Sequence, residues 1–138
     1  MLTLGTFRKP AVVATDVCFD LALGLPQAVE FFRRPPVDIR LATATYLELL
    51  QAARNAEEQQ RVRRFVQPYA VLSLGPMASS RAVELLWEHG VADGLEALPA
   101  LAAATALAHE IPLVTRNPAP YQRIAGLELL LPYEVDES

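Results

Sequence analysis

The sequence predicts an α/β fold in three layers, with a central, mostly parallel sheet between two layers of helices. Three observations support this prediction. Short apolar runs rich in β-branched residues recur along the chain, amphipathic segments with a helical period separate them, and proline or glycine marks the junctions. Strands that alternate with helices pair in parallel, because each helix carries the chain back across one face of the sheet.

The first strand is predicted at residues 11–15, a short apolar run with several β-branched residues. Asp16 follows it directly and is expected to cap a helix over residues 17–24, since aspartate is a favoured N-cap residue. Pro26 suits the first turn of the next predicted helix, residues 26–34, which a pair of prolines ends. The chain is therefore expected to begin with one strand and two helices.

A second strand is predicted at residues 37–42, where apolar and polar residues alternate. The helix after it is expected to begin at Thr43 or Thr45, because either hydroxyl can cap it, and to run to about Arg54. A charged helix follows over residues 56–66, and a proline ends it.

A third strand is predicted at residues 69–74, and an amphipathic helix at 76–89 after a Gly-Pro turn. Residues 91–98 are expected to be irregular. An Ala-rich helix over 99–109 should pack closely against the sheet, and a fourth strand follows at 113–115. The remaining predicted elements are a helical turn over 121–124 and a short strand over 127–131.

Apolar residues at helical spacing predict which face of each helix is buried. The positions predicted to face inward are Val29, Phe31 and Phe32; Leu47, Leu50 and Ala53; Val62, Phe65 and Val66; and Ala82, Val83, Leu86 and Trp87. In parallel sheets covered by helices, ligands bind beyond the carboxyl ends of the strands. Functional residues are therefore expected after the first and fourth strands, on the helix after the second strand, and at the start of the Ala-rich helix.

Length and composition predict one domain, residues 1–138, with a core over about 11–133 and terminal extensions at 1–9 and 135–138. The formal net charge is −4, so RNA binding would need a local basic patch. Cys18 is the only cysteine, which fits a reducing compartment, and no apolar run is long enough to span a bilayer. These features predict a cytoplasmic protein with no membrane partner.

Four segments follow a recognisable pattern in a fixed order. They are residues 12–20 (VVATDVCFD), 44–54 (ATYLELLQAAR), 94–107 (GLEALPALAAATAL), and 111–117 (IPLVTRN) with the closing segment up to Tyr133. Together they resemble the PIN-domain family, and within it the VapC-type toxin ribonucleases, over nearly the whole chain. The resemblance implies a three-layer α/β fold, a cleft with acidic residues, and cleavage of RNA with Mg²⁺ or Mn²⁺ in active members. It also implies an antitoxin partner and, in many members, a homodimer.

The resemblance implies catalytic and metal-binding roles for Asp16, Glu48 and Asn117, each at a position where the family carries an acid or an accepted variant. Two further family carboxylates fall on Ala14 and Pro99, so they are missing here. Mg²⁺ prefers hard oxygen ligands and serves to activate water and offset charge on a phosphate. With one Asp, one Glu and a neutral amide, we expect metal binding to be weak or absent.

Several candidate residues have a second interpretation. Thr115 and Arg116, which follow the fourth strand, can contact an RNA phosphate or simply cap and cover the strand end. Asp93 and Glu96 precede the Ala-rich helix and could replace the missing carboxylates. Asp16 can be a weak metal ligand or only a helix cap.

The histidines and the cysteine are not expected to carry chemistry. His89 and His109 are far apart in the sequence and lack ligand spacing, so they are expected at the surface or at helix ends. Cys18 lies among apolar residues and is expected to be buried and inert.

Three functional hypotheses remain open from the sequence. The first is a degenerate toxin-like PIN protein whose cleft binds RNA or a partner but cuts poorly or not at all. The second is an active Mg²⁺- or Mn²⁺-dependent endoribonuclease that uses substitute acids. The third is an interaction module that holds an antitoxin-like peptide in an apolar groove near Phe31, Phe32, Leu49 and Leu50.

Overall fold

The computed structural model of the protein describes residues 8–134. Residues 1–7 and 135–138, which make up most of the predicted terminal extensions, lie outside the described residues. The strands of the described part are β1 (Pro10–Val13), β2 (Asp38–Ala42), β3 (Ala70–Leu72), β4 (Leu113–Val114) and β5 (Leu129–Leu130). The helices are α1 (Thr15–Ala22), α2 (Pro26–Arg33), α3 (Thr43–Ala52), α4 (Ala56–Val66), α5 (Pro76–Asp93), α6 (Ala97–Ala108) and the short 3-10 helix η2 (Ala119–Tyr121).

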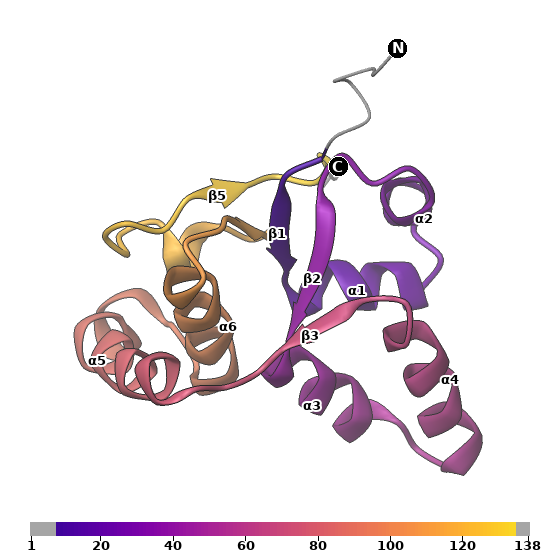
Figure 1. Ribbon diagram of the computed structural model, residues 1–138, viewed down its shortest axis with the longest axis horizontal. Helices are drawn as coiled ribbons and strands as arrows, with labels where there is room; N and C mark the ends of the chain where they lie inside the picture. The colour runs from indigo at the N-terminus through magenta and orange to yellow at the C-terminus, as the bar shows by residue number, and fades with distance from the viewer. Residues whose placement is uncertain (1–7, 135–138) are drawn as a thin grey trace.

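All five strands described pair in parallel, in the order β3-β2-β1-β4-β5 (Figure 1). β1 lies at the centre, where Val12 pairs with Arg40 of β2 on one side and with Leu113 of β4 on the other. The order reverses at β1, because the chain first builds outward to β3 and then returns to place β4 on the opposite side. A crevice beyond the carboxyl ends of β1 and β4 follows from this reversal.

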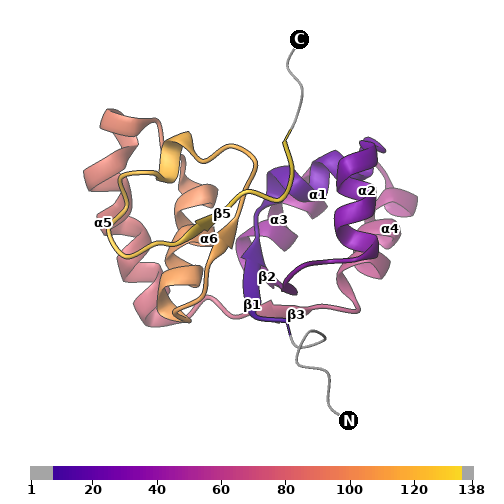
Figure 2. The same cartoon turned by 90° about the horizontal axis from the view of Figure 1, so that it is seen from above.

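The helices lie in two layers with the sheet between them (Figure 2). α5 and α6 cover one face, and α1, α2 and α4 lie on the other, while α3 contacts both α4 and α6. The alternation of β1 side chains divides the core accordingly, since Val12 packs with α5 and α6 whereas Ala11 and Val13 face the opposite layer. The predicted three-layer α/β fold is confirmed.

The Ala-rich helix α6 is the most deeply buried helix of its layer. Its fully or nearly fully buried residues are Ala100, Ala102, Ala103, Ala104, Thr105 and Ala106. Small side chains on several faces let the helix approach both the sheet and α5, as the composition predicts.

The junctions between elements differ from the prediction at the carboxyl edge of the sheet. α1 begins at Thr15, directly after Ala14, so the predicted start at residue 17 is wrong. α5 continues to Asp93 and ends at Gly94, whose φ of 73° lies in the left-handed region. α6 then begins at Ala97. The expectation of an irregular segment over 91–98 is therefore wrong at both of its ends.

The buried faces of three helices were partly mispredicted. The residues expected inside but found exposed are Val29 (43%), Leu47 (51%), Val83 (59%) and Trp87 (86%). α5 buries Ala82, as predicted, together with Ala78 and Leu85, because small residues allow the close packing that α6 requires. The predicted burial of Phe31 and Val66 is confirmed.

Candidate functional site at the carboxyl edge of the sheet

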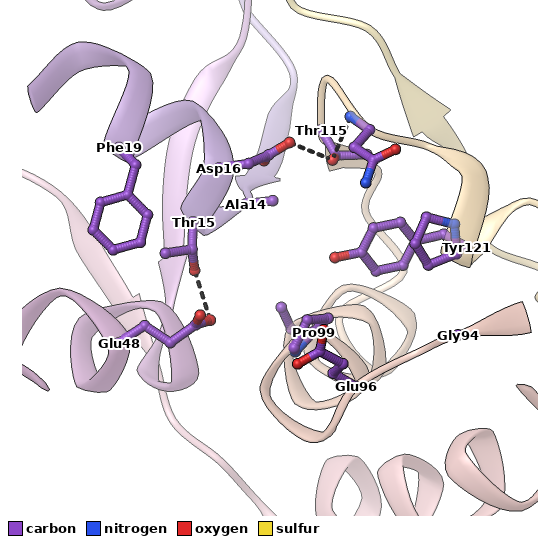
Figure 3. Close-up of a pocket in the computed structure, with 13 residues that line it drawn as sticks. Ala14, Thr15, Asp16, Phe19, Glu48, Gly94, Glu96, Pro99, Thr115 and Tyr121 are labelled. Atoms are coloured by element: carbon purple, nitrogen blue, oxygen red, sulfur yellow. Dashed lines mark hydrogen bonds between the residues drawn. The ribbon is translucent and has the colours of Figure 1, made fainter. Parts of the chain in front are cut away.

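A cavity of about 250 Å³ opens where β1 and β4 end, and most of the candidate residues line it. Asp16, Glu48 and Thr115 lie around it, from segments far apart in the sequence (Figure 3). Asn117 lines it as well. Arg116 does not line it. Four of the five candidate residues therefore lie together at this edge of the sheet.

Asp16 joins the first turn of α1 to the chain that follows β4. Its Oδ2 accepts hydrogen bonds from Thr115 Oγ1 at 2.9 Å and from the Arg116 backbone N–H at 3.0 Å. Its Oδ1 accepts from the Val17 N–H at 2.9 Å. The N-cap residue is Ala14, without a side-chain cap, so the predicted capping role of Asp16 is wrong. The carboxylate instead ties two walls of the cavity together.

Glu48 projects into the cavity from α3 and accepts a hydrogen bond from one threonine hydroxyl. Thr15 Oγ1 donates a hydrogen bond to Glu48 Oε1 at 2.9 Å and lies 3.0 Å from the hydroxyl of the fully buried Thr45. Burial raises the pKa of the Glu48 carboxyl above its ordinary value, and the hydrogen bond from Thr15 opposes that shift. The negative charges of Glu96 and Asp16 raise this pKa further.

Ala14 and Pro99, at the two positions where the family resemblance implies carboxylates, both line the cavity. Ala14 is 3% exposed and Pro99 lies in the first turn of α6, where a missing N–H costs no helical hydrogen bond. Within residues 8–134, no group of three or more His, Cys, Asp or Glu residues is placed to hold a metal ion. Ala14 and Pro99 offer no side-chain oxygen to a cation at these two positions.

The two proposed substitute acids lie differently. Glu96 is the N-cap residue of α6 and lines the cavity. Asp93 is turned away, since its Oδ2 lies 2.7 Å from His89 Nδ1 and its Oδ1 accepts from Arg123 Nη1 at 3.0 Å. The hydrogen bond with His89 lowers the pKa of Asp93. His89 itself is 6% exposed near the end of α5, so its predicted surface position is wrong and its predicted place at a helix end is right.

The Arg116 side chain binds α1 one helical turn beyond Asp16. Its Nε donates to Asp20 Oδ2 at 2.6 Å, and the Tyr133 hydroxyl donates to the same oxygen at 2.8 Å. Asp20 is 5% exposed, so the guanidinium balances a buried charge. Thr115 is also buried, and its hydroxyl accepts from the Asn117 N–H at 3.1 Å while it donates to Asp16. Of the two residues predicted to contact RNA, Thr115 lines the cavity, whereas Arg116 does not and is bound to Asp20.

Tyr121 is a cavity residue that the sequence analysis did not single out. It is 7% exposed, and its hydroxyl is directed into the cavity opposite Glu48 (Figure 3). Within the described residues, this hydroxyl has no hydrogen-bond partner. Burial, followed by the charges of Asp16 and Glu48, raises the pKa of Tyr121, so the group keeps its proton. The available sequence signal was its position close behind the Thr-Arg-Asn segment.

A second hollow of about 500 Å³ lies between α1, α3 and α4. Leu49 lines it, together with Val62 and Phe65 of α4. Phe31 and Phe32 do not, because their rings pack against each other at 5.3 Å inside the core. An apolar groove is therefore present on the α1, α3 and α4 side, although only one of its four predicted residues contributes.

A parallel α/β sheet with an acidic cavity at its carboxyl edge defines a class of protein that binds its ligand at the switch in strand order. Residues 12–127 match the family described as the PIN domain. The chain belongs to the PIN-domain family. No curated protein matches it. Within the described residues, no helix is long and apolar enough to cross a membrane.

Three solved structures illustrate the similarity. A chain of a toxin–antitoxin complex from Klebsiella pneumoniae is 26% identical, with a TM-score of 0.74 over 91% of this chain and 99% of that one. A chain of VapBC2 from Rickettsia felis, bound to a DNA fragment from its promoter, is 18% identical, with a TM-score of 0.71 over 88% and 97%. A chain of FitAcB from Neisseria gonorrhoeae is 15% identical, with a TM-score of 0.64 over 91% and 99%. The last two similarities show the fold alone.

Proposed function

We propose that this chain is a toxin-like PIN-domain protein whose cleft holds RNA or an antitoxin-like partner and has lost metal-dependent cleavage. One observation carries the proposal. The cavity lies where the family's active site is expected, yet Ala14 and Pro99 occupy the two positions at which the resemblance implies carboxylates.

The remaining oxygen ligands support the loss of metal chemistry. All three hydrogen bonds to Asp16 come from the protein's own donors, so a cation would have to compete with Thr115 and two backbone N–H groups. Glu48 has a raised pKa, which makes its charged form less favourable than that of an ordinary glutamate. Asn117 offers only a neutral oxygen. Such a set holds Mg²⁺ or Mn²⁺ poorly against bulk water.

An active Mg²⁺- or Mn²⁺-dependent endoribonuclease is the second candidate. The observation in its favour is Glu96, which lines the cavity with Glu48 and Asp16. A third carboxylate is thereby available near the site, although it projects from the opposite wall.

An antitoxin-like protein is the proposed partner, because the Klebsiella pneumoniae relative comes from a toxin–antitoxin complex. The hollow between α1, α3 and α4 offers a groove with apolar walls and a charged rim formed by Arg54, Glu58 and Arg61. An amphipathic segment of a partner suits such a groove. We also propose that the protein forms a homodimer, because Trp87 and Val83 of α5 are exposed apolar residues. We propose a cytoplasmic location for it.

The test is incubation of the purified protein with a pool of structured RNA in Mn²⁺, in Mg²⁺ and in chelator, beside the variant Glu48→Gln. The proposal predicts no cleavage beyond the background of the variant, together with measurable RNA binding by filter retention. Metal-dependent cleavage that disappears in Glu48→Gln would establish the second candidate instead. Neither cleavage nor RNA binding, with capture of an antitoxin-like peptide, would leave a protein-interaction module.

A further inference from the structure

The cavity has apolar walls of the kind that suit a flat ring. Ala14, Pro99 and Ala102 line it with small apolar surfaces. Phe19 borders it and is 36% exposed, and the ring of Tyr121 forms the wall opposite α1 (Figure 3). Aromatic side chains beside an open cavity stack on the bases of single-stranded nucleic acid. The two replaced carboxylates have therefore turned part of the site into a surface for an uncharged ring.

The polar groups of the cavity determine which hydrogen-bonding groups the edge of such a ring must carry. Asp16, Glu48 and Glu96 are acidic, and no Lys or Arg of the described residues lines the cavity, so a phosphate group is disfavoured there. Glu48 Oε1 accepts from Thr15, and its other oxygen has no partner within residues 8–134. An ionised carboxylate offers acceptors only, so it calls for N–H donors on the ligand.

Tyr121 favours a hydrogen-bond acceptor on the ligand. Its hydroxyl can both donate and accept a hydrogen bond. It is directed into the cavity and has no hydrogen-bond partner among the described residues. A ligand that satisfies both walls must therefore carry N–H donors beside an oxygen or nitrogen acceptor. An organic cation carries donors only, so it would satisfy the Glu48 carboxylate but offer no acceptor to the Tyr121 hydroxyl proton.

We propose that the cavity receives a single unstacked guanine, whose N1–H and N2–H donate to the Glu48 carboxylate while O6 accepts from the Tyr121 hydroxyl. Guanine is the common base with two adjacent donors followed by a carbonyl acceptor on its Watson–Crick edge. The sugar and phosphate remain outside the acidic cavity. This inference rests on the proposed RNA-binding function and names the base that the site selects, with Tyr121 as a specificity-determining residue.

The test is a titration of the full chain with guanosine, followed by ¹H–¹⁵N NMR, on the wild type, Tyr121→Phe and Glu48→Gln. Removing one hydrogen bond to the ligand should weaken guanosine binding about 3- to 10-fold in Tyr121→Phe, and Glu48→Gln should weaken it at least as much. Inosine, which lacks the 2-amino group, should bind the wild type several-fold more weakly than guanosine. Tyr69→Phe is the matched control, because Tyr69 packs in the core on the other side of the sheet and should leave binding unchanged.

Two results would overturn the inference. One is an affinity for guanosine that is the same in Tyr121→Phe as in the wild type, when thermal unfolding shows that both proteins are folded. The other is argininamide binding more tightly than guanosine and losing its affinity in Glu48→Gln, which would make the occupant an organic cation. Metal-dependent RNA cleavage lost in Glu48→Gln would refute the proposed loss of chemistry and leave the guanosine comparison intact, so the two failures are distinguishable.

Discussion

Replacement of Asp16 by alanine tests whether this carboxylate is a structural link in this protein. Asp16 Oδ2 accepts from Thr115 Oγ1 at 2.9 Å and from the Arg116 N–H at 3.0 Å, across the gap between α1 and β4. A metal ligand would be expected to have oxygens available, and its removal commonly relieves repulsion between acidic groups. A structural link predicts the opposite, a clear loss of stability.

The size of the loss follows from the environment of the donors. Thr115 is 2% exposed, so without Asp16 its hydroxyl is left without that acceptor, which costs about 1–3 kcal/mol. The Arg116 N–H belongs to an exposed residue, so water replaces the lost bond and the added cost is about 1 kcal/mol or less. We therefore expect Asp16→Ala to lower the free energy of unfolding by about 1–4 kcal/mol. Asp16→Asn keeps a carbonyl acceptor and should lose only about 1 kcal/mol.

The assay is urea unfolding of the wild type, Asp16→Ala and Asp16→Asn, each in chelator and in Mn²⁺. If Asp16 is a structural link, the free energy of unfolding should fall from the wild type to Asp16→Asn and again to Asp16→Ala. The differences should be the same in chelator and in Mn²⁺. A thermal scan should show Asp16→Ala melting roughly 10 °C lower. An Asp16→Ala variant within about 0.5 kcal/mol of the wild type, a difference typical of a plain surface substitution, would refute the reasoning.

Three further predictions concern the same edge of the sheet and its core. The folded-state pKa of Glu48 lies above the ordinary 4.5, so the stability that this group contributes at low pH is lost as pH rises through the folded pKa. Glu48→Gln should therefore gain stability over the wild type as pH rises above the ordinary 4.5, measured by urea unfolding, and a constant difference would contradict this. Burial raises the pKa of the Cys18 thiol to about 12, so a thiol reagent at about pH 8 should modify only unfolded protein, and rapid native-state labelling would argue against it. The double variant Ala14→Asp/Pro99→Asp should be less stable than the wild type in chelator and gain about 2.7 kcal/mol in Mn²⁺ at 100-fold its Kd, read from thermal unfolding. A wild type with the same gain would show that the two carboxylates were not the missing ligands.

The alternation of apolar runs and amphipathic segments was enough to predict the parallel sheet, because each pattern has a period that only one kind of element satisfies. The sequence determines less well which face of a helix is buried. α5 carries apolar residues on both faces, and the sequence favoured Val83 and Trp87 beside Ala82, whereas the core took Ala78 and Leu85 beside Ala82. Close packing against an Ala-rich neighbour decided this, and that neighbour is known only once the helices are in place.

The family resemblance was enough to predict which residue types line the cavity. It could not predict roles that depend on contacts between residues far apart in the sequence. Glu48 and Asn117 line the cavity as expected. The role of Asp16 depends on Thr115, 99 positions away, so no local pattern distinguishes a helix cap from this link. Tyr121 was missed for the same reason, since the direction of its hydroxyl depends on how η2 packs against α5.

The most direct test of the central claim is a titration of the protein with Mn²⁺, in which the free ion is followed by electron paramagnetic resonance, for the wild type and Glu48→Gln. A cleft that has lost its metal chemistry predicts indistinguishable curves for the two proteins, with only weak, salt-sensitive binding to surface carboxylates. One stoichiometric Mn²⁺ ion bound by the wild type and lost in Glu48→Gln would contradict the account and place this protein among the metal-dependent nucleases of its family.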